Sequence, residues 1–465
     1  MTRAEAPADA RHSRPRACPI LGRAALVALL REGLQLAAKE HEGLRRVLGW
    51  QEGTALTIAS VLGSGVLYLP ALTAQEAGPA GIFAWLAMGI LIVPLAFTLG
   101  HMATRIPDAG GIAAFARAAF GPAGGAAAGW LFLGTVPLGA PIAALIGAGY
   151  VSAAFGLDHL MLIAVAAGLL ALAVVLNALG VEISGRAVGV VVGLIALLLL
   201  AAIAVGFMHL RLSAFRPVLP HGVEPVGLDL ALLFWAFVGW EAVANYAEEF
   251  ADPERDLRRA MLASIAVIDT LYILLAVVTV GTGAYIGRNS QDALAVMLGQ
   301  GGGRLGVLAT SLLALLVTYG TIHAYVGAFV RLVYAQARAG DFPGYFARLH
   351  HRTRAPLRAV WTLAAVFFAV LALEAVHPVG LEGLVAWSSA VFIALYVLAM
   401  AAAMRLLEER RQRLTALFAL IVCLGTLPFL GWGAFYPLGL AAVGVGLRAT
   451  RCNPKCLWQG IRTGG

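Results

Sequence analysis

Lysine is almost absent from this chain of 465 residues, and charged residues of every kind are scarce. Lys39 and Lys455 are the only lysines, so the chain has no phosphate-binding GxxxxGK[ST] loop, which excludes an ATP-driven pump of that type. Asp, Glu, Lys and Arg make up 12% of the residues, about half the share in a typical soluble domain. The sequence therefore excludes a soluble protein with an ordinary charged surface.

Cysteine is also rare, and the usual catalytic and metal-binding motifs are missing. The four cysteines are Cys18, Cys423, Cys452 and Cys456, and the last two lie in CNPKC without a neighbouring histidine, so we expect free thiols rather than a metal site. The sequence has no HExxH, no GxSxG and no repeated filter loop, which disfavours an intramembrane enzyme or a channel. We expect no catalytic residue, no metal and no cofactor.

Long apolar runs are what the chain has instead, because 60% of its residues are hydrophobic. The runs are long enough to cross about 30 Å of hydrocarbon as helices, which predicts an all-α integral membrane protein in a lipid bilayer. We expect twelve transmembrane helices, at residues 54–77, 80–104, 122–154, 159–180, 187–210, 228–247, 260–286, 305–336, 357–376, 381–404, 414–431 and 434–448.

The positive charges are placed as a topology signal rather than as a nucleic-acid surface. The formal net charge is +8, yet the arginines lie almost wholly between alternate pairs of runs and in the two tails. The chain has 33 lysines and arginines. If both termini lie in the cytoplasm, those on the outer side are Arg211, Arg216, Arg288 and Arg304. This bias predicts cytoplasmic N- and C-termini and no nucleic-acid partner. No feature of the sequence specifies an oligomeric state.

Two apolar runs are interrupted at their centres. The first contains LGSGVLYLP (62–70), with Gly63, Ser64 and Gly65 together. The sixth reads LALLFWAFVGWEAVANYAEEF (230–250) and is interrupted at Val238–Gly239. Unsatisfied backbone groups in hydrocarbon cost several kcal/mol each, so these interruptions need a purpose. Each opens a block of five runs, which predicts two inverted repeats that begin with broken helices and surround a substrate site.

These repeats define the domains that we expect. Residues 1–42 form a cytoplasmic extension that is disordered or amphipathic, residues 43–450 form the transporter domain, and residues 451–465 form a cytoplasmic tail. The two repeats within the transporter domain are residues 54–210 and 228–404, and residues 414–448 supply the last two helices.

The first break has the groups needed to bind a carboxylate. The N–H groups of Ser64, Gly65 and Val66 open the second half of the broken helix, where the helix dipole is positive, and the Ser64 hydroxyl adds another donor. Carbonyl groups of Val61 and Leu62, with those near Trp235 and Val238, could bind an ammonium group. We therefore predict a zwitterionic amino acid as the ligand. The alternative is that the glycines serve only close helix packing.

Three segments carry a resemblance to a known family. LGSGVLYLP, RIPDAGGIAAFARAAFGP (105–122) and FWAFVGWEAVANYAEEFADPERDLRRAM (234–261) resemble segments of the amino acid–polyamine–organocation (APC) superfamily of transporters. GWLFLGTVPLGAPIAALIGAGY and FVRLVYAQA are similar to segments of bacterial exporters of methionine and branched-chain amino acids. The resemblance implies secondary transport of methionine, leucine, isoleucine and valine by alternating access, outward across the bacterial inner membrane. An uptake permease or an exchanger is the alternative.

The resemblance also implies roles for particular residues. Its substrate cradle comprises the Val61 carbonyl, Ser64 and Gly65 in the first break, with the second break around Gly239 supplying the carbonyls of Trp235 and Val238. Trp235 is placed as an aromatic gate, and Glu241 matches an acidic position.

The coupling ion is not fixed by these residues. Glu241 is a candidate for coupling or gating, or else a fixed partner of backbone amides, and Asp269 is a candidate because it is a carboxylate within a span. Residues 187–210 lack the lysine that replaces a sodium ion in many relatives, so proton coupling, sodium coupling and exchange all stay open.

The residues predicted to line the side-chain pocket are uncharged, and only Glu241 adds an acid nearby, which favours neutral substrates. We expect His323 to be a hydrogen-bonded packing residue. The residues expected to line the pocket are Val136, Pro137, Leu138, Ala140, Thr318, Thr321, Trp387, Ser388 and Ser389.

Overall fold

The computed structural model describes residues 49–106, 111–179, 185–241, 250, 252–286, 292–338, 342–350, 355–378 and 380–451. The described residues are mainly helical and contain no β-strand, which confirms the all-α prediction. The predicted extension at residues 1–42, the CNPKC motif and all but the first residue of the predicted tail lie outside the described residues.

Most helices coincide with predicted spans, although residues 242–247 of the sixth predicted span (228–247) lie outside the described residues. In chain order they are α2 (Trp50–Val61), α3 (Gly65–Ala77), η1 (Gly78–Ala80), α4 (Gly81–Arg105), α5 (Ile112–Phe155), α6 (His159–Ala178), α7 (Gly185–Met208), η2 (Leu212–Phe215), α8 (Glu224–Leu232), η3 (Leu233–Trp235), the π-helical turn η5 (Pro253–Leu257), α10 (Arg258–Thr282), α11 (Ala293–Arg338), η7 (Gly344–Phe346), α12 (Leu357–Val376), α13 (Leu381–Leu406), α14 (Arg410–Thr426), η8 (Leu427–Ala434) and α15 (Phe435–Arg451). Within the described residues, eight helical stretches are long and apolar enough to cross a membrane, and two of these stretches, at 65–105 and 410–449, each join two helices.

Two glycines mark where the longest predicted spans begin. Gly121 (φ 73°) and Gly303 (φ 55°) adopt the left-handed region inside α5 and α11. This conformation interrupts a right-handed helix and is easy only for glycine. The spans predicted from residues 122 and 305 start directly after these two positions, so the glycines separate each transmembrane helix from a short helical segment before it.

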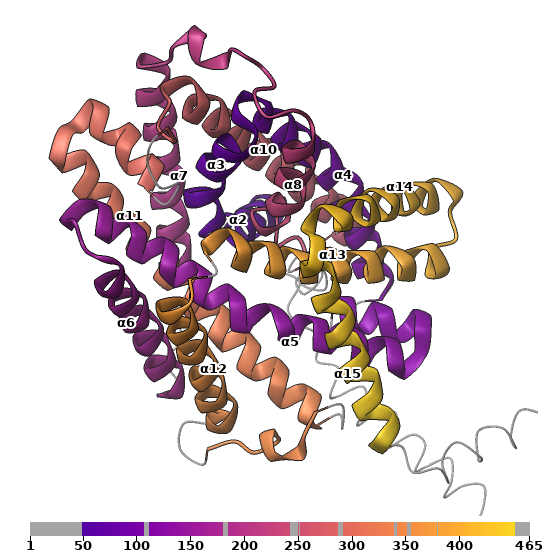
Figure 1. Ribbon diagram of the computed structural model, residues 1–465. Helices are drawn as coiled ribbons and strands as arrows, with labels where there is room; N and C mark the ends of the chain where they lie inside the picture. Colours follow the sequence, from indigo (N-terminus) through magenta and orange to yellow (C-terminus); the bar gives the residue numbers. More distant parts are fainter. Residues whose placement is uncertain are drawn as a thin grey trace, which may run out of the picture. The chain divides into compact units, whose positions relative to one another are not determined.

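The broken first helix lies in the interior of the bundle. Every residue of α3 except Gln75 and Glu76 is buried, and α3 contacts α4, α5, α8, α10 and α11. Helices such as α6 and α12, which lie side by side at the edge of Figure 1, instead expose large apolar side chains such as Leu160 and Trp361. A buried broken helix surrounded by helices with exposed apolar faces is the arrangement expected of a transporter in lipid.

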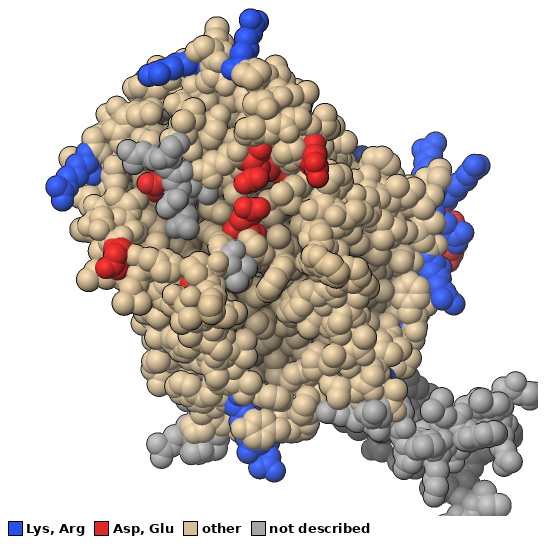
Figure 2. All heavy atoms as spheres, viewed as in Figure 1, with Lys and Arg blue, Asp and Glu red and all other residues tan. Residues whose placement is uncertain are grey.

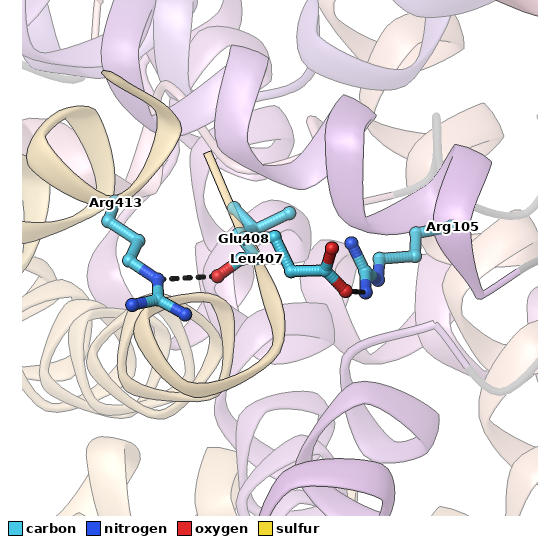
Figure 3. Close-up of polar contacts among 4 residues, drawn as sticks. All are labelled: Arg105, Leu407, Glu408 and Arg413. Carbon is cyan, nitrogen blue, oxygen red and sulfur yellow. Dashed lines mark hydrogen bonds and ion pairs between the residues drawn. The ribbon is translucent and has the colours of Figure 1, made fainter. Parts of the chain in front are cut away.

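A charged contact links α4 to the connection between α13 and α14. Arg105, the last residue of α4, forms an ion pair with Glu408, and the Arg413 side chain donates a hydrogen bond of 2.5 Å to the Leu407 carbonyl (Figure 3). The hydrogen bond and positive charge of Arg105 lower the pKa of Glu408. The contribution of this pair to stability is therefore present above the usual glutamate pKa and is lost as the pH falls. It is small, because both side chains are exposed to solvent.

Candidate functional site

The first break comprises residues 62–64, between α2 and α3. The Leu62 N–H donates a hydrogen bond to Ile58 O at 2.8 Å, and this bond ends α2. The Gly63 N–H donates a hydrogen bond to Val61 O at 2.8 Å. The helix resumes at Gly65, and Ser64 is buried at its start. The predicted break is therefore confirmed at the predicted glycines. The first N–H groups of α3 have no partner within the helix, so they are available to a ligand.

The second break comprises residues 233–241, after α8. The sequence predicted the interruption at Val238–Gly239, but the α-helix ends earlier, at Leu232. The N–H groups of Ala236 and Phe237 both donate to Leu233 O, at 2.9 and 3.2 Å, and the chain continues as turns. The Leu232 carbonyl, which would pair with the Ala236 N–H in a continuing helix, accepts from the Ser389 hydroxyl at 3.2 Å instead. The Ala236 carbonyl accepts from the Tyr272 hydroxyl at 3.1 Å.

The two breaks pack directly against each other. A Cβ atom at Gly65 would lie 3.0 Å from Ala236 Cα and 3.1 Å from Trp235 Cδ1. A Cβ atom at Gly239, which has φ 124°, would collide with the carbonyl oxygen of Ser60. Gly65 lets the backbone of the second break approach, and Gly239 lets the last turn of α2 approach, so groups far apart in sequence come together.

Tyr272 of α10 joins the two breaks and was missed by sequence reasoning. Its hydroxyl lies 3.3 Å from Val61 O and 3.1 Å from Ala236 O, and the side chain is fully buried. Trp85 and Phe237 pack against its ring edge-on, with centroids 5.3 and 5.1 Å away. The only signal in the sequence is a tyrosine within an apolar span, which is more often a packing residue.

The Tyr272 hydroxyl also lies within hydrogen-bonding distance of the Val61 carbonyl. This carbonyl was predicted to bind a substrate ammonium group, yet here it accepts from the Gly63 N–H and from the Tyr272 hydroxyl. The Tyr272 hydroxyl has one proton, which it shares between Val61 O and Ala236 O, so Val61 O faces two donors in this state. An ammonium group at Val61 O would compete with the Tyr272 hydroxyl for this carbonyl.

We expect Tyr272→Phe to lower the melting temperature of the substrate-free protein, because a buried carbonyl without its donor costs about 1–3 kcal/mol. Added leucine should then raise the melting temperature more in the variant than in the wild type, since the ammonium group fills the vacated position. Thermal melting with and without leucine measures both effects. Tyr345→Phe, at an exposed tyrosine, is the matched control. Equal gains from leucine in variant and wild type would place the ammonium group elsewhere.

Trp235 lies between three helices. A Cβ atom at Gly139 of α5 would be 3.1 Å from its ring atom Cη2, the Phe392 ring of α13 is 6.3 Å away between centroids, and Gly65 of α3 touches Cδ1. The side chain is 8% exposed, and its ring N–H is buried without a hydrogen-bond partner. The Trp235 ring is therefore packed between α3, α5 and α13 next to the first break.

Glu241 holds the backbone of the second break. Its Oε2 atom accepts from the Gly239 N–H at 3.1 Å and from the Tyr396 hydroxyl of α13 at 2.8 Å. The sequence left two roles open for Glu241: coupling or gating, or a fixed partner of backbone amides. The structure shows the contact with a backbone amide.

Glu241→Gln should change the pH dependence of transport more than the melting temperature. The amide oxygen of glutamine can still accept both hydrogen bonds, but the side chain no longer titrates. Transport by purified protein in vesicles over a range of pH values measures the first effect, and thermal melting measures the second. An unchanged pH profile would leave Glu241 as a partner of the backbone only.

Asp269 is not brought into the two breaks. It lies on α10 beside α4, where a Cβ atom at Gly89 would be 3.1 Å from Oδ2, and its Oδ1 atom is buried without a partner. His323 is buried, with the Asn177 amide nitrogen 3.3 Å and the Tyr319 hydroxyl 3.4 Å from its Nδ1 atom, in line with the packing role predicted for it.

The predicted pocket residues fall largely in the interior, with one exception. Ser388 and Ser389 are buried, and the Ser389 hydroxyl donates to Leu232 O at 3.2 Å. Trp387 is 41% exposed and packs against Gly433 instead, so its prediction as a pocket residue is wrong. Adjacent helix positions point about 100° apart, and the two serines take the inward face.

The other pocket residues come from α5 and α11. Val136, Leu138 and Ala140 are buried on α5, and Pro137 is partly buried. Thr318 of α11 is buried against Gly147, while the Thr321 methyl group would be 4.0 Å from a Cβ atom at Gly63 in the first break.

These features define a class of protein: a multi-pass membrane transporter in which two broken helices meet at one interior site. A solved structure shares this fold: the manganese transporter of Eremococcus coleocola matches with a TM-score of 0.54, at 14% sequence identity over 87% of this chain and 96% of that one. The family is more specific. Residues 48–446 match the amino acid permease family model, and the chain belongs to that family.

Two relatives are similar over nearly their full lengths. The uncharacterized amino acid permease YecA of Bacillus subtilis is 41% identical over 89% of this chain and 97% of its own length. The L-methionine/branched-chain amino acid exporter YjeH of Escherichia coli is 33% identical over 86% of this chain and 95% of its own length. The chain is therefore a transporter and not an enzyme.

Proposed function

We propose that this protein is a secondary transporter of neutral amino acids that binds its substrate between the two breaks and moves it by alternating access. The observation that carries the proposal is the contact of the breaks through Gly65 and Gly239, which places the start of α3 beside the second break. One ligand can then reach the free amides of one break and the carbonyls of both.

The two charged groups of an amino acid fit these two kinds of backbone group. The amides of Ser64, Gly65 and Val66, at the positive end of α3, favour a carboxylate. The carbonyls of Val61 and Ala236 both face the Tyr272 hydroxyl, and an ammonium group in its place could bind both. The carbonyls of Trp235 and Val238 belong to the same break and complete the proposed cradle. Trp235 is the proposed gate.

The surrounding side chains favour neutral substrates. The inward residues of α5, α11 and α13 near the breaks are small, apolar or hydroxyl-bearing, such as Val136, Thr318 and Ser388. A charged substrate side chain would be desolvated there without a partner, which is costly. An apolar pocket separates substrates that differ by one methylene by only about 1–3 kcal/mol, so methionine, leucine, isoleucine and valine should overlap as substrates.

The direction of transport is proposed to be outward, across a bacterial inner membrane, with both termini in the cytoplasm. The distribution of lysine and arginine supports the orientation, and the similarity to the exporter of Escherichia coli supports export. Cells that lack the protein should then accumulate these amino acids and tolerate their toxic analogues less well.

Flux in proteoliposomes tests this function. Purified protein should show saturable exchange of labelled leucine that unlabelled methionine, isoleucine and valine inhibit, while arginine and glutamate do not. Liposomes without protein provide the background. Strong inhibition by arginine or glutamate, with none by methionine or valine, would contradict the proposed substrate class.

A further inference from the structure

A second carboxylate in the interior has no role in the site described above. Asp229 lies on α8, before the second break, and its side chain is fully buried. Neither of its carboxylate oxygens has a hydrogen-bond partner, and no ion pair reaches it in the part of the chain that the structure describes. A buried carboxylate without a partner is strongly disfavoured in its ionised form, so in this state Asp229 needs a bound proton or another cation.

The acidic residues around Asp229 lie toward the surface at one end of the bundle. Glu76 near the end of α3 and Glu382 near the start of α13 are the charged groups that act on it most, and both are partly exposed. The exposed Glu224 lies on its own helix, and a ring nitrogen of His221 lies 2.7 Å from the Glu76 carbonyl oxygen. Figure 2 shows a group of acidic side chains near the middle of the face that it draws, with the arginines toward the margins.

The other elements that pack against α8 add no positive charge beside Asp229. Residues 81–100 of α4 contain no titratable side chain, and Gly81 is so close that a Cβ atom there would be 3.2 Å from Asp229 Oδ2. The η8 segment contains no titratable side chain either, and it places Phe429 against Gly227. The titratable group of α14 nearest to η8 is Cys423, a free thiol.

The geometry favours a proton over a metal ion. Among the described residues, no group of three or more acidic, histidine or cysteine side chains is close enough together to hold a metal ion. The space beside Asp229 is instead limited by the backbone at Gly81. A proton needs no further ligand and can be taken by a single carboxylate.

We propose that Asp229 is a proton-binding site that couples amino acid transport to protons at the end of the bundle where Glu76 and Glu382 lie. This inference rests on the proposed transport function. Under the proposed orientation, this is the outer end, because α3 ends there and α4, α8 and α13 begin there. When α8 moves away from α4 and water enters, the Asp229 O–H bond breaks and its proton passes to water or to the carboxylate of Glu76 or Glu382. Closing this end requires Asp229 to take a proton back.

The test compares wild type, Asp229→Asn and the matched control Glu224→Gln in proteoliposomes. Leucine counterflow at equal pH on both sides measures carriage of the substrate, and net leucine flux under an imposed pH gradient measures coupling. We expect the gradient to raise net flux several-fold in wild type and Glu224→Gln. Asp229→Asn should keep counterflow near the wild-type rate and lose the response to the gradient.

Two results would overturn the coupling role: no response to the gradient in wild type, or an equal response in Asp229→Asn. Absence of leucine counterflow in wild type is a different result, because it would contradict the proposed transport function itself. If Asp229→Asn does not fold, Glu382→Gln decides the question. Removal of this negative neighbour should move the midpoint of the pH–flux profile to lower pH, since an ionised Asp229 is then less disfavoured. An unmoved midpoint overturns the proposal.

Discussion

Replacing Gly65 with valine is expected to abolish amino acid binding without preventing insertion into the membrane. A Cβ atom at Gly65 would already lie 3.0 Å from Ala236 Cα and 3.1 Å from Trp235, and valine adds two methyl groups beyond that atom. Overpacking of this kind costs about 1–3 kcal/mol, and the branched side chain also crowds the proposed carboxylate receptor. Together these effects should weaken binding by about 100-fold or more.

The matched control for this change is Gly168→Val. Gly168 lies on α6, is exposed, and has open space where its Cβ atom would be. Equilibrium binding of labelled leucine to the purified variants measures the effect, and size-exclusion profiles show whether each variant is folded. Wild-type affinity in a folded Gly65→Val protein would place the substrate away from the first break.

Removing the ring of Trp235 should have the next largest effect. The ring fills the space between Gly65, Gly139 and Phe392, so Trp235→Ala leaves a large gap beside the first break. Loss of a buried tryptophan costs about 3–5 kcal/mol in packing, and the proposed gate over the substrate is lost with it. Trp235→Phe should keep part of both the affinity and the transport rate, because an aromatic ring of smaller size remains.

Trp432→Ala provides the comparison, since Trp432 is 88% exposed. Leucine affinity and exchange rate should fall strongly in Trp235→Ala, partly in Trp235→Phe and not in Trp432→Ala. Should Trp235→Ala bind and exchange leucine as the wild type does, the gate must be formed by another residue.

The sequence predicted those features that depend on local chemistry. Glycines in the middle of an apolar run are unfavourable without a purpose, so the break at Gly63–Gly65 could be located from the residues alone. The predicted starts of the long spans in α5 and α11, placed where the apolar runs begin, lie just after Gly121 and Gly303, which interrupt these helices.

The features that the sequence did not predict depend on contacts between distant segments. At the early end of α8, the freed Leu232 carbonyl accepts from Ser389, which lies on another helix. Tyr272 itself looks like any tyrosine in an apolar span until the two carbonyls that it contacts are known. The orientation of Trp387 depends on how far α13 is rotated, and no local pattern of residues specifies that rotation.

The requirement for both charged groups of the substrate can be measured with two analogues of leucine. The first, 4-methylpentanoate, lacks the ammonium group, and the second, 3-methylbutylamine, lacks the carboxylate, while both keep the branched side chain. Competition against labelled leucine in proteoliposomes gives the inhibition constant of each. If the amino acid spans the amides of α3 and the carbonyls of the two breaks, both analogues should bind at least about 100-fold more weakly than leucine, because each leaves one set of buried polar groups without a partner. Inhibition by either analogue at the concentration at which leucine inhibits would contradict a site built from both sets.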